Sequence, residues 1–368
     1  MTSLKWEALP FSQEELKRYL SSLVSAEVCV AAVRELRDEG EEEKLKGFGY
    51  GIPLLIECAC DGKKERFVFH TMSRNGFGHE RRSDRAANAL LDHATFNDLP
   101  RHVRSRDVGA LSEEGELISL GGTGEFFHLT RYAEGTPYAT DLHHISKAAE
   151  LVPEDENRVL VLADYLADIH TVKHADPLLY RRRIRDLVGH GEGIMGILDN
   201  YPSDFAIAPP ARLEEIEVKC LAWRWRIKTA TQRLSQVHGD FHPWNVLFRE
   251  GTDFALLDRS RGAWGEPADD VSSMSVNYIF FSLQRYGELA GPFRRLYDLF
   301  WDRYLDHTGD EELLTVIQPF YAWRALVLAS PVWYPNLDDA VREALFCFAE
   351  RVLDTKRFNP HRTSDYLP

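Results

Sequence analysis

The densest cluster of chemically useful residues in this chain of 368 residues is Val237-His238-Gly239-Asp240-Phe241-His242-Pro243-Trp244-Asn245-Val246-Leu247-Phe248. Asp240 lies in a turn that exposes its carboxylate, and this carboxylate can orient or deprotonate a substrate hydroxyl group. Asn245 lies one turn further on, where its amide oxygen can reach a metal ion. Pro243 stiffens the loop between them and so helps to hold both groups at a fixed separation.

A second apolar strand follows this loop and ends on a carboxylate. It reads Phe254-Ala255-Leu256-Leu257-Asp258. The spacing from Asp240 to Asp258 fits a hairpin that runs out and back, so both carboxylates and the Asn245 amide can converge at its open end. Two carboxylates and an amide around a hard cation suit a magnesium ion that carries the phosphates of a nucleotide.

A turn and the start of a helix come next. Gly265 and Pro267 are turn residues, and Pro267 also suits the first turn of a helix. Asp270 falls in that first turn. Its carboxylate can accept backbone N–H groups of the loop around Asp240, or it can stabilise only the N-terminus of its own helix. The residues alone leave both roles open. His238 is expected to brace the turn before Asp240 through its own hydrogen bonds.

These motifs in this order resemble the aminoglycoside phosphotransferase and choline kinase-like family of small-molecule kinases, which shares the protein-kinase fold. The family pattern is close to HGD-x-x-x-x-N, then I-D, then G-D-P-x-x-D, and this chain has HGDFHPWN, LLD and GEPADD. The resemblance implies that Asp240 is the catalytic aspartate and that Asn245 and Asp258 are the magnesium ligands. It also implies that Asp270 supports the catalytic loop.

The resemblance extends more weakly over other parts of the chain. Residues 126–135 are similar to the strand and hinge that link the two lobes of such kinases. This implies that backbone groups of Arg131, Tyr132 and Ala133 meet the adenine edge of the nucleotide. Residues 166–170, Leu-Ala-Asp-Ile-His, are similar to the helix that precedes the catalytic loop.

The family's phosphate-binding lysine has no counterpart on the expected third strand, residues 65–72. His70 occupies the corresponding place and could contact an α- or β-phosphate, since a histidine is partly charged near neutral pH. The alternative is that His70 is a packed strand residue. Other cationic candidates are Lys64, Arg66 and Arg74.

A glycine-containing loop, Gly47-Phe48-Gly49-Tyr50-Gly51, precedes a strand. A loop that covers phosphates should stand there, because its backbone N–H groups can bind the anion. Gly47 and Gly49 are therefore candidate nucleotide-binding residues. Glycines at alternate positions are also common in plain turns, and this alternative stays open.

Strand patterns dominate before about residue 135, and helical patterns dominate after it. The predicted strands span 27–36, 52–60, 65–72, 117–120 and 124–132, and the predicted helices span 13–24, 83–94, 156–173, 176–187, 211–236, 268–286, 288–306, 311–328 and 338–355. Asp61-Gly62 predicts a hairpin turn, and Ser83 is expected to cap its helix.

With the resemblance, these patterns predict a protein-kinase-like α+β fold of two lobes. Residues 1–135 are expected to form an N-lobe, an antiparallel sheet plus a helix that covers the nucleotide. Residues 136–368 are expected to form a mostly helical C-lobe. The C-lobe carries the catalytic loop, 238–248, and the metal-binding loop, 257–270.

Composition narrows the classes of function. The 44 basic and 58 acidic side chains give a net charge of −14, whereas a nucleic-acid-binding face must be basic, so no nucleic-acid partner is expected. No apolar run is long enough to span a membrane, and the first residues lack the apolar core of a signal peptide. The five cysteines, with Cys58 and Cys60 as a pair on one strand face, are expected to be reduced thiols in a cytoplasm.

The leading hypothesis is an ATP- and Mg²⁺-dependent kinase that phosphorylates a hydroxyl group of an aminoglycoside, amino alcohol or sugar, with GTP open as the nucleotide. The excess of acidic over basic side chains slightly favours an amine-bearing acceptor. Five acids could bind amines, although each is expected to be a solvated surface charge: Glu266, Asp269, Asp338, Asp339 and Glu343. The absent lysine motivates a second hypothesis, a catalytically weak nucleotide-binding regulatory module. The oligomeric state stays open.

Overall fold

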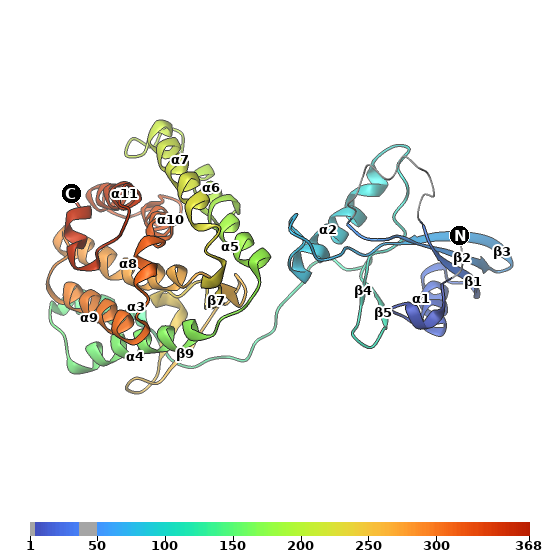
Figure 1. Ribbon diagram of the computed structural model, residues 1–368, viewed down its shortest axis with the longest axis horizontal. Coiled ribbons are helices and arrows are strands. Elements are labelled where there is room, and N and C mark those ends of the chain that lie inside the picture. The colour runs from blue at the N-terminus through green and yellow to red at the C-terminus, as the bar shows by residue number, and fades with distance from the viewer. Residues whose placement is uncertain (1–3, 37–49) are drawn as a thin grey trace. The chain divides into compact units, whose positions relative to one another are not determined.

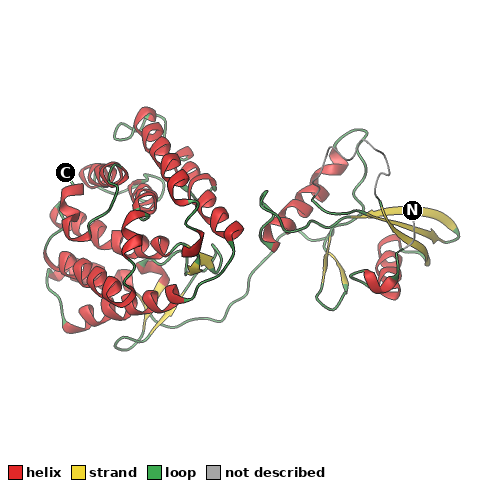
Figure 2. Ribbon diagram, viewed as in Figure 1, coloured by secondary structure: helices red, strands yellow, loops and turns green. Residues whose placement is uncertain are grey.

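The computed structural model describes residues 4–36 and 50–368. The chain divides into two compact units, Met1–Thr130 and Arg131–Pro368. The first unit contains the three-stranded sheet and two of the longer helices, and the second is mostly helical (Figures 1 and 2). Each unit has its own apolar core.

The first unit is built on an antiparallel sheet with the strand order β1-β2-β3. Its elements are η1 (Trp6–Ala8), α1 (Gln13–Val24), β1 (Val28–Glu35), β2 (Leu54–Cys60), β3 (Lys63–Phe69), α2 (Arg82–Thr95), η3 (Phe96–Asp98), β4 (Gly109–Leu111) and β5 (Leu117–Ser119). Ser12 caps α1 by accepting the backbone N–H of Glu15. The buried face of α1, Leu16 and Leu20, belongs to the same apolar core as Val30 and Ile56 of the sheet. Burial of these faces holds the helix on the sheet.

A tight turn joins β2 to β3 at the predicted position. Asp61 and Gly62 both have positive φ angles, 46° and 79°, and Cys60 pairs with Lys63 across the turn. Two central residues with positive φ define the two-residue hairpin turn that suits the right-handed twist of antiparallel strands.

Two local predictions in the first unit were wrong. Residues 124–132, all of them described, form neither helix nor strand, and the side chains of Phe127 and Leu129 are 92% and 86% exposed. The apolar pattern there has no partner strand in the structure, and a strand needs one for its backbone hydrogen bonds. Helix α2 begins at Arg82 with Arg81 as its N-cap residue, and Ser83 does not cap it. The carboxylate of Asp84 accepts the Arg81 N–H at 2.7 Å.

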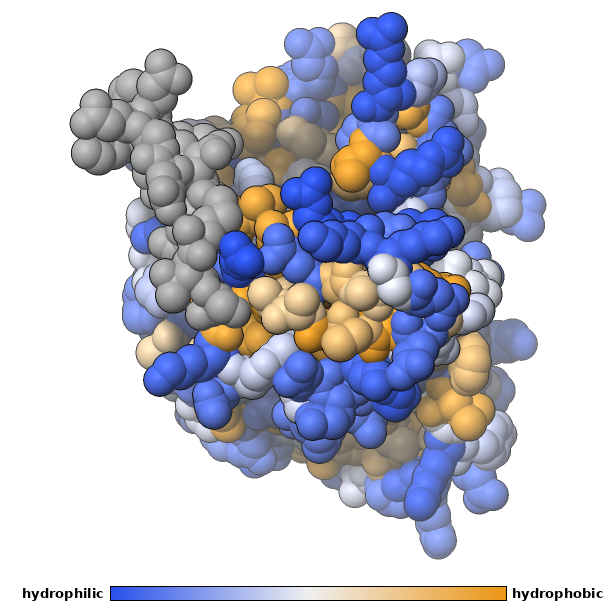
Figure 3. Space-filling view, turned by 90° about the vertical axis from the view of Figure 1, so that its right-hand side faces the viewer, coloured by the Kyte–Doolittle hydropathy of each residue, from blue (hydrophilic) through white to orange (hydrophobic). Residues whose placement is uncertain are grey.

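Hydrophilic residues cover most of the face seen in Figure 3, and hydrophobic residues form patches between them. Cys58 is buried on β2, Cys60 beside it is partly buried, and all five cysteines are free thiols. Burial is the main reason that the pKa of the Cys58 thiol rises to about 11, and the neighbouring Cys60 contributes. Among the helices of the described residues, none is long and apolar enough to cross a membrane.

The second unit is a packed group of helices that carries short strands. Its elements are β6 (Thr136–Pro137), α3 (Tyr138–Ala148), α4 (Pro153–Thr171), α5 (Pro177–Gly189), α6 (Ile194–Asp199), α7 (Pro210–Ile227), η4 (Thr231–Arg233), β7 (Ser235–Gln236), η5 (Pro243–Asn245), β8 (Val246–Phe248), β9 (Phe254–Leu256), β10 (Trp264–Gly265), α8 (Pro267–Tyr286), α9 (Gly291–Thr308), η6 (Glu311–Thr315), α10 (Gln318–Ala329), α11 (Asp339–Leu353) and η7 (Pro360–Tyr366). Helix α8 is central, since every residue from Pro267 to Leu283 is buried and it packs against α9 and α10.

The helix predicted over 211–236 is too long. Helix α7 ends at Ile227, and Ser235 and Gln236 form β7, which pairs with Gly265 and Trp264 of β10. This pairing joins residues about thirty positions apart, so a local pattern of apolar residues carries no sign of it. Helix α3 was not predicted at all, although Tyr138 and Leu142 give it a buried face.

The β2–β3 turn provides a direct test of the backbone. Gly62→Ala should lower the free energy of unfolding by about 1–2 kcal/mol, because a Cβ atom disfavours its positive φ. Steric clash does not contribute, since the added Cβ would meet nothing within 4 Å. Urea denaturation of the intact chain measures the effect. Gly122→Ala is the control, because its Cβ also meets nothing and it has no positive φ. Equal midpoints for the two variants would contradict the turn assignment.

Candidate active site

The short hairpin of β8 and β9 positions two of the predicted ligands. Val246 pairs with Leu256, and the carbonyl of Asn245 accepts the N–H of Leu257 at 2.9 Å. Asn245 precedes β8 and Asp258 follows Leu257, so the structure places Asn245 and Asp258 at the same end of the hairpin. Their position follows from the antiparallel register.

The loop before the hairpin is closed by its own hydrogen bonds. Asn245 Nδ2 donates to the backbone oxygen of Asp240 at 3.0 Å and lies 3.2 Å from His242 Nε2. The amide nitrogen therefore faces the loop, and the amide oxygen is left for a cation. The N–H of Asp240 donates to His238 Nδ1 at 3.3 Å, which is the contact expected of His238. Asp240, Asn245 and Asp258 thus belong to one compact segment.

Asp258 has a left-handed backbone, with φ of 52°, and an exposed side chain. Its Oδ1 accepts the N–H of Ser260 at 3.2 Å. Aspartate tolerates this conformation better than most residues, because its short polar side chain can bond locally. Non-glycine residues in this region cluster at functional sites, which fits a carboxylate presented to a ligand.

Asp240 is 9% exposed, and its side chain is held by two arginines. Arg324 Nη1 and Arg261 Nη1 each lie 2.6 Å from its Oδ1, and His242 Nε2 lies 3.6 Å from its Oδ2. Burial by itself would raise the pKa of Asp240. The charge of Arg324 is the largest opposing effect, and with His242 and Arg261 it holds the pKa of Asp240 well below its usual range. The carboxylate is therefore charged at neutral pH.

Asp270 is fully buried and accepts hydrogen bonds from the loop that carries Asp240. Its Oδ2 accepts the N–H of His238 at 2.8 Å, and its Oδ1 accepts the N–H of Gly239 at 2.7 Å. His170 Nε2, from the end of α4, lies 3.2 Å from Oδ2. Although burial opposes the charged form, the hydrogen bond from His170 and the nearby backbone N–H groups lower the pKa of Asp270. A charged Asp270 suits both roles that the sequence left open, support of the loop and stabilisation of its own helix N-terminus. The hydrogen bonds required for the first role are present.

Two acids expected on the surface are buried ion pairs, so that prediction was wrong. Glu266 is 1% exposed, and Arg233 donates to both of its oxygens at 2.7–3.0 Å. Asp269 is 2% exposed and accepts from Arg324 at 2.6 Å and from Arg183 at 3.2 Å. A charge is buried in a protein only when it is paired in this way.

The arginines around Asp240 were missed by sequence reasoning. Arg324 lies in α10, far along the chain, and nothing in its neighbourhood marks it as part of this loop. Arg261 does carry a signal, because it stands three residues after Asp258. Arg259 closes the same segment by donating to the backbone oxygen of Val237 at 2.8 and 3.0 Å.

Of the candidate nucleotide-binding residues, the structure describes His70, Arg131, Tyr132 and Ala133, and none of these four lies within a helix or strand. His70 is exposed and follows the last residue of β3, and the lysines of that strand, Lys63 and Lys64, lie at its turn end. Gly47 and Gly49 lie outside the described residues. Arg131, Tyr132 and Ala133 fall at the start of the second unit and form neither helix nor strand, with Tyr132 89% exposed.

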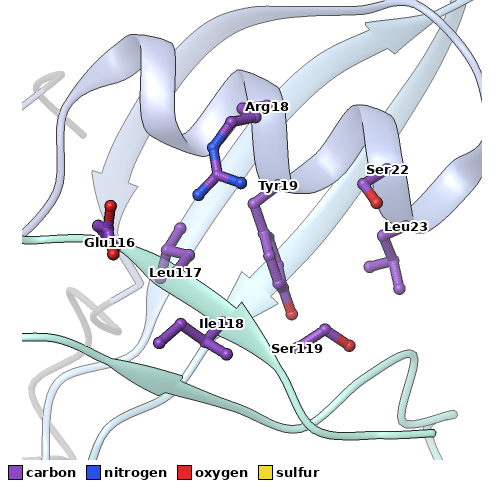
Figure 4. A pocket seen from close by; sticks show the side chains of 8 residues that line it. All are labelled: Arg18, Tyr19, Ser22, Leu23, Glu116, Leu117, Ile118 and Ser119. Carbon is purple, nitrogen blue, oxygen red and sulfur yellow. The ribbon is translucent and has the colours of Figure 1, made fainter.

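An open groove of about 660 Å³ lies in the first unit between α1 and β5 (Figure 4). Arg18 and Tyr19 line it from the helix, and Leu117 and Ile118 line it from the strand. None of the predicted site residues is among the residues that line this groove.

The donor set at the hairpin end fits magnesium. Mg²⁺ is usually bound through one or two carboxylates together with water and substrate phosphates, without an all-protein cage. The exposed carboxylate of Asp258 and the amide oxygen of Asn245 supply such a partial set. Among the described residues, no cluster of three or more His, Cys, Asp or Glu side chains could hold a metal by itself.

The chain matches the model of one known protein family. Residues 71–310 match the model of the phosphotransferase enzyme family APH. The chain belongs to this family. The matched segment includes the loop of Asp240, both predicted magnesium ligands and Asp270, and it ends before Arg324. No curated protein sequence matches the chain closely enough to count as a relative.

Several solved structures resemble this APH-family chain at low identity. A glucosamine kinase in complex with glucosamine, ADP and inorganic phosphate is 17% identical over 59% of this chain and 61% of its own, with a TM-score of 0.35. Choline kinase from Cryptosporidium parvum is 11% identical over 91% and 86%, with a TM-score of 0.34. A thermostable mutant of aminoglycoside phosphotransferase APH(4)-Ia is 17% identical over 92% and 98%, with a TM-score of 0.36.

Membership of the APH family confirms the resemblance that the motifs carry. The predicted fold class, a protein-kinase-like α+β fold with an antiparallel sheet in the first part and helices in the second, is confirmed as well.

Asp270→Asn separates the two roles that the sequence left open. A brace of the catalytic loop predicts a loss of about 3–5 kcal/mol in the free energy of unfolding, because an amide cannot accept both N–H groups or pair with His170. A role at the helix N-terminus alone predicts about 0.3–1 kcal/mol. Urea denaturation measures the difference. Asp339→Asn is the control, since Asp339 is in the first turn of α11 and its side chain is 83% exposed. Equal losses in the two variants would rule out the brace.

Proposed function

We propose that the chain is an ATP- and Mg²⁺-dependent kinase that phosphorylates a hydroxyl group of a small molecule. The acceptor classes to consider are aminoglycosides, amino alcohols and sugars. The observation that carries the proposal is the placement of Asn245 and Asp258 at one hairpin end, with the charged carboxylate of Asp240 in the loop that precedes it. GTP stays open as the alternative nucleotide.

In the proposed reaction, Asp240 orients the acceptor hydroxyl group or accepts its proton as the acceptor oxygen attacks. The acceptor oxygen forms a bond to the γ-phosphorus of the nucleotide, while the bond from that phosphorus to the β–γ bridging oxygen breaks. The nucleoside diphosphate leaves with the electron pair of that bond. Magnesium, when bound, neutralises charge on the phosphates. Asn245 and Asp258 would hold the magnesium ion, and Asp270 and His238 keep the loop in shape.

The nucleotide would be bound by further residues that the family resemblance suggests. Backbone groups of Arg131, Tyr132 and Ala133 are proposed to meet the adenine edge. His70 and the loop of Gly47 and Gly49 are proposed to contact the phosphates. Contacts from His70 would be weaker than those of a buried lysine at the same end of the strand, because a histidine is only partly charged at neutral pH.

Several acids that could have bound an amine group of the acceptor already pair with arginines of this chain. Glu266 and Asp269 are held by buried arginines, and Glu343 accepts from Arg212 at 2.7 and 2.9 Å. An amine-bearing acceptor would therefore have to find other carboxylates, such as the exposed side chain of Glu192, which lies 3.6 Å from Arg261. Acceptors with and without amines belong in the same test panel.

The second candidate is a catalytically weak nucleotide-binding regulatory module. One observation favours it, namely that β3 ends before His70 and carries its lysines only at the turn end. Such a module would bind nucleotide without consuming it faster when an acceptor is added. The first experiment is therefore nucleotide consumption with Mg²⁺ and a panel of aminoglycosides, amino alcohols and sugars.

Asp240→Ala should lower the acceptor-stimulated rate by about 10²- to 10⁴-fold, since the group that orients the hydroxyl group or takes its proton is removed. Initial-rate kinetics on both proteins measure this. Asp253→Ala should keep the wild-type rate, because Asp253 is an exposed acid at the opposite end of the same hairpin and pairs with Arg249. Wild-type turnover that survives in Asp240→Ala would contradict the role of Asp240.

Removal of magnesium with EDTA should abolish turnover, and added Mg²⁺ should restore it. Asp258→Asn should raise the Mg²⁺ concentration needed for half-maximal rate, because a neutral amide replaces the charged ligand. A magnesium titration of the two proteins at saturating nucleotide measures the shift. An identical magnesium dependence would remove Asp258 from the metal site.

A further inference from the structure

Arg324 of α10 links the catalytic loop to the central helix α8. Its Nη1 donates to Oδ1 of Asp240 at 2.6 Å, and its Nη2 donates to Oδ1 of Asp269 at 2.6 Å. Nη2 also lies 3.3 Å from the backbone oxygen of Gly239. One planar guanidinium group, 7% exposed, thus contacts the catalytic carboxylate, its loop and α8 at once.

The position of this guanidinium group is itself fixed. Helix α10 packs against α8, and the hydroxyl groups of Tyr321 and Ser275 lie 2.7 Å apart between them. The indole ring of Trp323 lies 4.0 Å from the Arg324 guanidinium carbon and donates to the backbone oxygen of Glu192 at 2.9 Å. Arg324 therefore has little freedom to follow a movement of Asp240.

The two oxygens of Asp240 have different surroundings. Oδ1 lies 2.6 Å from both Arg324 and Arg261, which occupies its lone pairs. Oδ2 lies 3.6 Å from Nε2 of His242, which is beyond hydrogen-bonding distance. The carboxylate is therefore anchored through one oxygen, and the other oxygen is left to accept a hydrogen bond.

We infer that Arg324 is a positioning residue of the phosphoryl transfer, which anchors Oδ1 of Asp240 so that Oδ2 faces the acceptor hydroxyl group. This inference rests on the proposed function. The rigid fork of an arginine fixes the plane of a carboxylate, whereas the point charge of a lysine does not. Arg324 lies outside the residues that match the family model, 71–310, so the family motifs do not include it.

The test compares Arg324→Met and Arg324→Lys with Arg183→Met. Arg183 is the matched control, because it is 8% exposed and pairs with the other oxygen of Asp269 at 3.2 Å. For each protein we would measure the thermal unfolding midpoint, the kcat of acceptor-stimulated turnover and the KM for nucleotide.

A positioning role predicts that kcat of Arg324→Met falls by about 10²-fold, the cost of a misplaced reacting group, while the KM for nucleotide stays near wild type. Arg324→Lys should recover part of this kcat, since it keeps the charge but not the fork. Arg183→Met should lose stability and keep most of its kcat. If Arg324→Met does not fold, Arg324→Lys carries the test, with a reduced kcat at an unchanged KM as the expected result.

Equal kcat values in the Arg324 variants and wild type would overturn the inference and leave the proposed function standing. An equal loss of kcat in Arg183→Met and Arg324→Met would also overturn the inference. It would show that losing either arginine partner of Asp269 is enough to lower kcat. Absence of acceptor-stimulated turnover in the wild-type protein would overturn both, and this outcome is distinct because it precedes any comparison of variants.

Discussion

The buried carboxylate of Asp270 joins three segments that are far apart in the chain. It lies on α8, accepts hydrogen bonds from two backbone N–H groups of the loop before Asp240, and contacts His170 of α4. An ionised group in an apolar core costs several kcal/mol unless it is paired and hydrogen-bonded. The helices must therefore come together in the one arrangement that satisfies this carboxylate, and that arrangement sets the conformation of the loop that carries Asp240.

A second layer of charges is built on the first. Asp269, the neighbour of Asp270, is held by Arg183 and Arg324, and Arg324 reaches on to Asp240. Glu266, at the start of the same helix, is held by Arg233. The N-terminus of α8 thus gathers three buried acids, each with its own partner. Phosphoryl transfer depends mainly on positioning and charge neutralisation, so a site of this kind benefits from rigid, paired charges.

The parts of the site that depend on short local sequence patterns were predicted, and the parts that depend on packing between distant segments were not. The hairpin of β8 and β9, the end shared by Asn245 and Asp258, and the helix beginning near Pro267 all follow from short patterns of strand, turn and cap residues. The strand predicted over 124–132 failed because an apolar run becomes a strand only with a partner, and partners are set by tertiary structure. Arg324 could not be found, because its role depends on the packing of α10 against α8 and no spacing in the sequence encodes it.

The most direct test of the central claim is to follow the phosphoryl group itself. The protein would be incubated with Mg²⁺, ATP that carries ¹⁸O as a label on its γ-phosphate, and each acceptor of the panel. The products would be identified by ³¹P NMR, which detects the label as a shift of the phosphorus signal. The account predicts that the label appears as a phosphate ester on the hydroxyl group of one acceptor class. Label found only in unreacted ATP or in inorganic phosphate, with every acceptor, would contradict it.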